Sequence, residues 1–164
     1  MKTIGVIGSD GLIPRKVARI AEAIGTDIAR RGIALLCGGR GGVMEAACRG
    51  ANKAGGLTVG ILPSLDRSQA NKYLDIVIPT SLGYARNSIV VSAPDAIIAV
   101  CGSAGTLSEI AMALNYRKPV VLVEGTGGMA DEAGSIRFDK EYACLIHRAK
   151  PENAVETAEK LINF

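Results

Sequence analysis

A run of five apolar residues, AIIAV at positions 96–100, sets the strongest limit on how this chain can fold. A strand that faces water on one side alternates apolar and polar residues, whereas an unbroken apolar run indicates burial on both faces. Such strands are typical of parallel sheets that helices cover on both sides. Similar short runs along the chain predict strands at 3–8, 33–37, 57–62, 76–79, 96–101, 119–124 and 144–147.

Segments with helical spacing separate these strands. Between residues 17 and 28 the apolar residues recur every three or four positions, and Pro14 suits the first turn of that helix. Further helices are predicted at 43–54 and 84–93, from Thr106 and from Pro151, with a Gly-rich connection at 124–140 that is either a lid, an interface or a surface loop. The alternation over 164 residues predicts a single Rossmann-like α/β domain, 1–164, with a doubly wound, mostly parallel sheet and helices on both faces.

Charge and the first residues exclude several classes of protein. The net charge is +3, and no basic tract or alternation of aromatic and basic residues is present, so we expect no binding to nucleic acid. The opening MKTIGVIGSDG is interrupted by Gly5, Gly8 and Asp10, which fits neither a signal peptide nor a membrane span. We therefore expect a cytoplasmic protein that makes no membrane contact and whose ligand is a small or anionic molecule.

The four cysteines indicate neither a metal centre nor a disulfide framework. They contain no CxxC pair, and His147 is the one histidine in the sequence. Cysteine within strands and helices behaves as a small hydrophobic residue. No metal site is expected.

Three glycine-rich loops each follow a predicted strand and precede a predicted helix. Ligands of parallel α/β sheets bind at the carboxyl ends of the strands. Glycine lets backbone N–H groups approach an anion, and the following helix presents its positive end, although such loops also occur simply to turn the chain. None of the loops reads GxGxxG or ends in GK[ST]. The candidate anion-binding residues are Gly8, Ser9, Gly38, Gly39, Arg40, Gly41, Gly42, Gly102, Ser103, Ala104, Gly105 and Thr106.

The third loop continues into Thr106-Leu107-Ser108-Glu109, which has the spacing of a helix capping box. In that arrangement the threonine oxygen accepts from the Glu109 backbone N–H, and the carboxylate accepts from the Thr106 N–H. A glutamate used in this way only stabilises the helix. If Glu109 faces a ligand instead, a nearby cation must hold it there, and Arg86, 23 residues earlier, is the candidate.

The order and intervals of these elements resemble the Lonely Guy family of phosphoribohydrolases and its relatives, some of which carry the label lysine decarboxylase. That family has an Arg-Lys pair followed by PGGxGTxxE, to which Arg86-Asn87 and CGSAGTLSE at 101–109 correspond here. GGRGGVME at 38–45 corresponds to an earlier GGGxxGLMG element, and the likeness covers residues 4–123. The resemblance implies hydrolysis of the N-glycosidic bond of a nucleoside 5'-monophosphate to free base and ribose 5-phosphate. It also implies Arg86 and Glu109 as the catalytic pair, no cofactor, and a homodimer or higher homo-oligomer.

Three residues depart from the family pattern: Asn87 replaces its lysine, Cys101 its proline and Ser103 its second glycine. Losing a cation weakens the anchoring of an anionic substrate, and a side chain at position 103 limits how closely the loop approaches a phosphate. With these residues the chain resembles the molybdenum cofactor carrier proteins, a sister group that shares the GGRGGVME-type loop. Proteins of that group bind a phosphorylated pterin. DNA-processing protein A, a further relative, would need a basic surface. Two hypotheses remain: a phosphoribohydrolase, favoured by Arg86 and Glu109, and a carrier without turnover, favoured by Asn87 and Ser103.

Overall fold

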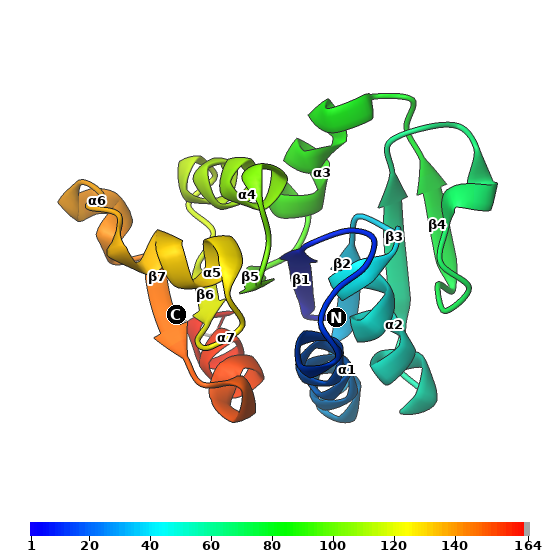
Figure 1. The fold of residues 1–164 in the computed structure, drawn as a ribbon, viewed down its shortest axis with the longest axis horizontal. Coiled ribbons are helices and arrows are strands. Elements are labelled where there is room, and N and C mark those ends of the chain that lie inside the picture. Colours follow the sequence, from blue (N-terminus) through cyan, green and yellow to red (C-terminus); the bar gives the residue numbers. More distant parts are fainter. Residues whose placement is uncertain (163–164) are drawn as a thin grey trace.

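A parallel sheet of seven strands forms the centre of the computed structural model, which describes residues 1–162 (Figure 1). The order is β4-β3-β2-β1-β5-β6-β7, and every neighbouring pair is parallel. The strands are β1 (Thr3–Gly8), β2 (Ala34–Cys37), β3 (Thr58–Leu62), β4 (Ile76–Pro79), β5 (Ala96–Val100), β6 (Val120–Val123) and β7 (Ile146–Ala149). The predicted fold class is confirmed. The order reverses between β1 and β5, and their carboxyl ends are where such sheets bind ligands.

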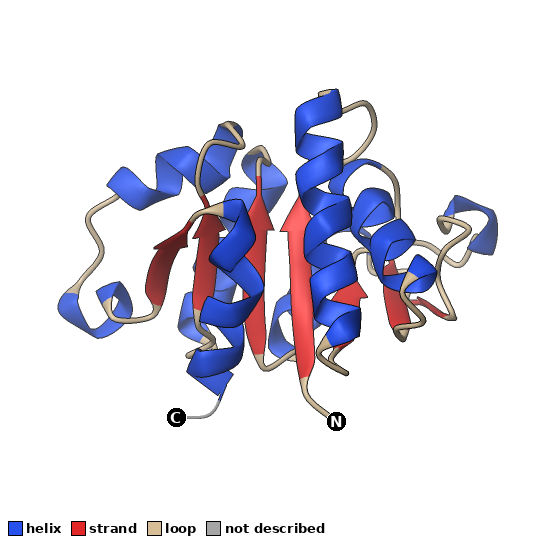
Figure 2. Ribbon diagram, turned by 90° about the horizontal axis from the view of Figure 1, so that it is seen from below, coloured by secondary structure: helices blue, strands red, loops and turns tan. Residues whose placement is uncertain are grey.

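Helices cover both faces of the sheet. They are α1 (Arg15–Arg30), α2 (Gly42–Lys53), α3 (Asn87–Ser92), α4 (Ala104–Asn115), α5 (Gly128–Glu132), α6 (Lys140–Ala143) and α7 (Ala154–Ile162). In Figure 1, α3 and α4 lie above the sheet and α1 and α7 below it, and Figure 2 looks from below onto the α1 side. None of the helices within residues 1–162 combines the length and the apolar composition that a membrane crossing requires.

The strand AIIAV is buried on both faces, as its composition predicts. All five of its residues have 0% exposure. Ala96, Ile98 and Val100 belong to the hydrophobic cluster that includes α1, α2 and α7, whereas Ile97 and Ala99 belong to the cluster that includes α3, α4 and α5. Because a strand points successive side chains to opposite faces, this central strand contributes to both halves of the core.

Helix α4 begins at Ala104, two residues before Thr106, where we predicted its start. Cys101 and Gly102 have positive φ angles of 56° and 100°, which turn the chain sharply after β5, so helical geometry starts at once. Thr106 therefore lies inside the first turn, and the helix has no side-chain cap. Of the two alternatives for Glu109, the capping box with Thr106 is therefore wrong.

The connection at 124–140 contains helix α5 and a 3-10 turn at 133–135. Ala130 and Ala133 are buried in the same hydrophobic cluster as α4. The Asp131 carboxylate accepts hydrogen bonds from the N–H groups of Gly125 and Gly127, which ties the turn to α5. The first part of this connection is thus packed against the core. The last strand lies at 146–149 rather than at the predicted 144–147.

Helices α1 and α2 pack backbone against backbone through two glycines. A Cβ atom on Gly25 would lie 1.9 Å from the Ala47 carbonyl oxygen, and one on Gly50 would lie 1.9 Å from that of Glu22. Since neither carbonyl can move without shifting a helix, Gly50→Ala should lower the free energy of unfolding by about 2 kcal/mol, measured by urea denaturation. Gly105→Ala in α4 is the matched control, because its Cβ would meet nothing within 4 Å. Equal stability of the two variants would contradict this packing.

Candidate functional site

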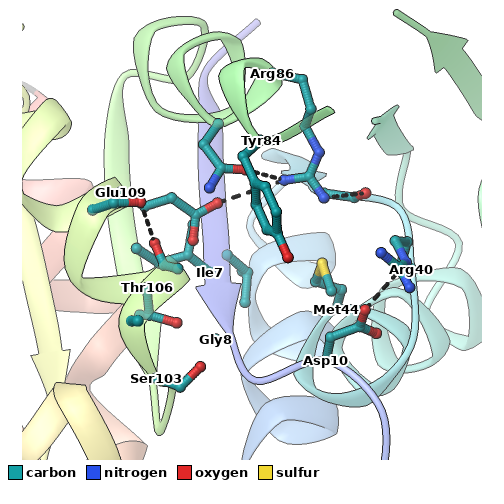
Figure 3. Close-up of a pocket in the computed structure, with 16 residues that line it drawn as sticks. Ile7, Gly8, Asp10, Arg40, Met44, Tyr84, Arg86, Ser103, Thr106 and Glu109 are labelled. Atoms are coloured by element: carbon teal, nitrogen blue, oxygen red, sulfur yellow. Dashed lines mark hydrogen bonds and ion pairs between the residues drawn. The ribbon is translucent and has the colours of Figure 1, made fainter. Parts of the chain in front are cut away.

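A cavity of about 530 Å³ lies where β1, β2 and β5 end (Figure 3). The loops after these three strands contribute to its wall, and the 3-10 turn Gly83–Arg86 with the start of α3 closes one side. The structure therefore brings the three predicted loops together. Of the predicted site residues, the following line the cavity: Gly8, Gly38, Arg40, Arg86, Ser103, Ala104, Gly105, Thr106 and Glu109.

The remaining candidates, Ser9, Gly39, Gly41, Gly42 and Gly102, do not line this cavity. The Ser9 hydroxyl accepts a hydrogen bond of 3.1 Å from the Gly102 N–H, which joins the first loop to the third. Gly42 has a φ angle of +62°, and a Cβ there would lie 2.1 Å from the Ser9 carbonyl oxygen. Ser9, Gly42 and Gly102 therefore hold the three loops against one another.

Sequence reasoning did not nominate Asp10, Met44, Tyr84 or Ser108, which also line the cavity. The Asp10 carboxylate accepts hydrogen bonds from the N–H groups of Gly11 (2.8 Å) and Gly41 (3.0 Å) and lies 3.1 Å from Nε of Arg40. Asp10 thus connects the first loop to the second. The available signal was its place two residues after the glycine that ends β1.

Arg86 and Glu109 form a buried ion pair in the cavity wall. Nη1 of Arg86 lies 3.7 Å from Oε1 of Glu109, and the two residues are only 8% and 7% exposed. Nη2 donates to the Gly38 carbonyl at 3.2 Å, and Nη1 donates to Oδ1 of Asn87 at 2.5 Å. Asn87 accepts a hydrogen bond here that the family's lysine could not accept.

Hydrogen bonds offset only part of the free-energy cost of burying this ion pair. Nε of Arg86 is buried and has no hydrogen-bond partner within residues 1–162. Leaving a buried donor unsatisfied costs about 1–3 kcal/mol, and a buried ion pair seldom repays its desolvation. Stability alone does not account for the pair, which is the arrangement expected of a functional site.

Burial also changes the proton affinity of both groups. Desolvation raises the pKa of Glu109 to about 7, and the smaller attraction of Arg86 acts in the opposite direction. Desolvation lowers the pKa of Arg86, and the charge of Glu109 opposes that shift. A carboxyl group whose pKa is raised toward neutrality is suited to gaining and losing a proton there.

The amino end of α4 lies in the wall of the same cavity as this pair. No side chain caps the helix, whose N-cap residue is Ser103. The first N–H groups of a helix lack intrahelical partners and carry the positive end of its dipole. Because Ser103, Ala104, Gly105 and Thr106 all line the cavity, these groups can receive a phosphate there.

The cysteines lie outside the cavity wall. Cys37, Cys48, Cys101 and Cys144 are free thiols, and the sulfur atoms of Cys37 and Cys48 lie 3.5 Å apart in the core. Across residues 1–162, no group of three or more His, Cys, Asp or Glu side chains is arranged to hold a metal ion.

One of the proteins similar in sequence to this chain is an enzyme. The chain is 32% identical over 121 residues to the cytokinin riboside 5'-monophosphate phosphoribohydrolase of Mycobacterium tuberculosis. The match covers 68% of this chain and 65% of the mycobacterial protein, so about a third of that enzyme has no counterpart in the alignment.

Among the solved structures similar to this one are molybdenum cofactor binding and carrier proteins. The molybdenum cofactor binding protein of Rippkaea orientalis is 39% identical with a TM-score of 0.86, and the match covers 98% of this chain and 97% of that protein. The molybdenum cofactor carrier protein of Chlamydomonas reinhardtii is 35% identical with a TM-score of 0.86, and the match covers 100% of both chains.

A more distant likeness concerns the fold alone. DNA processing protein A of Helicobacter pylori is 18% identical with a TM-score of 0.73, over 97% of this chain and 80% of that one.

The family description that matches this sequence, SLOG cluster4, extends over residues 1–155. Nearly the whole length of the sequence, with its three loops and the sheet that carries them, fits that description, and the chain belongs to the SLOG cluster4 family.

Proposed function

We propose that this protein binds a phosphorylated heterocyclic ligand in the cavity and hydrolyses the N-glycosidic bond of a nucleoside 5'-monophosphate. The observation that carries the proposal is the burial of Glu109 beside Arg86, which raises the pKa of the carboxyl group to about 7. The uncapped amino end of α4 in the same cavity supports it. The likeness to the mycobacterial phosphoribohydrolase agrees with this chemistry.

In the proposed reaction, the N–H groups at the start of α4 bind the phosphate and leave the ribose near Glu109. Cleavage of the glycosidic bond develops positive charge on the ribose, which the Glu109 carboxylate stabilises. Glu109 accepts a proton from the attacking water, whose oxygen bonds to the anomeric carbon, and returns a proton to the departing nitrogen of the base. Arg86 holds the carboxylate in place and is a positioning residue in this scheme.

Incubation of the purified protein with AMP, GMP, CMP and UMP, followed by chromatography of the free bases, tests the proposal. Release of a base that depends on enzyme concentration supports hydrolysis. Saturable binding without release would overturn the hydrolase and leave a binding protein. Neither release nor binding of any phosphorylated ligand would overturn both.

A carrier without turnover is the second candidate, and a specific contact favours it. Oδ1 of Asn87 accepts from Arg86, so the position of the family's lysine supplies no second cation to the cavity. The likeness to the Chlamydomonas carrier over 100% of both chains agrees with this reading. Molybdenum cofactor, a phosphorylated pterin, would then be the cargo, and its saturable binding together with absence of base release is the expected result.

We also propose that the protein is cytoplasmic and forms a homodimer or higher homo-oligomer, as its resemblance to the Lonely Guy family suggests. We further propose that it does not bind nucleic acid, because its net charge is only +3 and it has no basic tract. Size-exclusion chromatography with light scattering measures the assembly. A shift in the mobility of single-stranded DNA at physiological salt would contradict the last part, because a protein with few phosphate contacts binds weakly there.

A further inference from the structure

The side chain of Tyr84 is held out over the cavity with most of its surface in water. It is 91% exposed, although it lines the cavity wall. Figure 3 shows its ring between Glu109 on one side and Met44 and Arg40 on the other. Its hydroxyl has no hydrogen-bond partner among the described residues, and it is the one aromatic residue in the wall of this cavity.

The backbone that carries this ring is fixed at both ends. Tyr84 lies in the 3-10 turn Gly83–Arg86, whose first residue has a φ angle of +56° and donates a hydrogen bond of 2.8 Å to the Pro63 carbonyl. The last residue of the turn, Arg86, is anchored by its buried side chain. An aromatic side chain with two rotatable bonds on a fixed turn loses little conformational entropy when it binds a ligand.

Apolar side chains line the same cavity as this ring. Met44 and Ile7 line the cavity and are 6% and 2% exposed. A second hollow of about 210 Å³ lies against the same tyrosine and also shares Arg40 and Arg86 with the first. Because Tyr84 is 91% exposed and borders both hollows, its ring is accessible to a planar molecule, and apolar and charged side chains line the same cavity.

We propose that Tyr84, the exposed aromatic side chain of the cavity, stacks on the bicyclic heteroaromatic ring of the ligand. This inference rests on the proposed function, since it takes the phosphate of the same ligand to lie at the start of α4. A purine and a pterin are both planar bicyclic rings, and either can stack on an aromatic face. Tyr84 is thus a residue that determines binding of the ring rather than of the phosphate.

Isothermal titration calorimetry of the wild-type protein and of Tyr84→Ala, Tyr84→Phe and Leu82→Ala tests this. Three probes separate the parts of the ligand: 9-deazaadenosine 5'-monophosphate, whose C-glycosidic bond resists hydrolysis, a pterin monophosphate, and ribose 5-phosphate. Leu82 is the control because it is 48% exposed near Tyr84 but does not line the cavity. The probe that the wild-type protein binds more tightly identifies the ring as purine or pterin.

Tyr84→Ala should weaken binding of the preferred ring-bearing probe by about 10-fold or more and leave ribose 5-phosphate within about twofold. Tyr84→Phe and Leu82→Ala should bind all probes like the wild-type protein. Unchanged affinity of Tyr84→Ala for both ring-bearing probes, or an equal loss for ribose 5-phosphate, would overturn the stacking role alone. Absence of binding of every probe by the wild-type protein would overturn the proposed function and, with it, this inference.

Discussion

Glu109→Gln should lower the rate of base release from the best nucleoside monophosphate by at least about 100-fold, the usual contribution of a general acid–base group. Glutamine has the size and shape of glutamate, but it cannot accept and return a proton. The cavity, the Gly38 and Asn87 contacts of Arg86 and the amino end of α4 remain as they are. The affinity of Glu109→Gln for 9-deazaadenosine 5'-monophosphate should therefore stay within about threefold of the wild-type value. Calorimetry measures this affinity, and kcat is measured on the same preparations.

Glu45→Gln is the matched control for this substitution. Glu45 also lies in the first turn of a helix that follows a glycine-rich loop, in this case α2, but it does not line the cavity. Its replacement should leave kcat unchanged. If Glu109→Gln keeps full activity and instead loses stability, Glu109 serves the fold and the catalytic assignment is wrong.

The stability of the wild-type protein relative to Glu109→Gln should fall by about 3 kcal/mol as the pH rises from about 4.5 to 8. Burial raises the pKa of Glu109 to about 7 in the folded protein, against an ordinary value of 4.5 in the unfolded chain. The folded state thus binds this proton more tightly, so the stabilisation is complete below pH 4.5 and is lost as the pH rises through 7. The size of this fall in stability follows from about 1.4 kcal/mol for each unit between the folded and unfolded pKa values of Glu109.

Urea unfolding of both proteins at half-unit intervals of pH measures this difference. Titrating groups that do not interact with Glu109 are shared by the two proteins and cancel. Base release by the wild-type protein should rise with pH through about 7, where Glu109 becomes the carboxylate that accepts the water proton. Parallel stability curves for the two proteins would mean that Glu109 is solvated and titrates like an ordinary glutamate.

The parts of the fold that sequence reasoning predicted correctly depend on local composition. AIIAV is apolar at every position, and this alone indicates a strand buried on both faces. The meeting of the three glycine loops follows from the same inference, since strands that run parallel end at one edge of the sheet. Arg86 and Glu109 were paired by their interval within a family pattern, and the structure has them 3.7 Å apart.

The errors arise where backbone geometry or distant contacts decide. Thr106 and Glu109 have the spacing of a capping box, but the positive φ angles of Cys101 and Gly102 start α4 at Ala104 and leave Thr106 inside the helix. Glycine at position 102 permits such an angle, but the local pattern does not indicate the positive φ of Cys101. Tyr84 was overlooked for a related reason: a tyrosine between two small residues has no periodicity that would distinguish an exposed ring at a cavity from a surface side chain.

The sequence by itself determined the parallel sheet, the three loops at its carboxyl edge and the residue types that meet there, because apolar periodicity and glycine content act over a few neighbouring residues. Only the tertiary structure decided what Glu109 can do. Its pKa depends on how completely the folded chain excludes water from Glu109, which is 7% exposed, and on the 3.7 Å between its Oε1 and Nη1 of Arg86. Desolvation is the sum of contacts from elements far apart in the chain, so no local pattern encodes it.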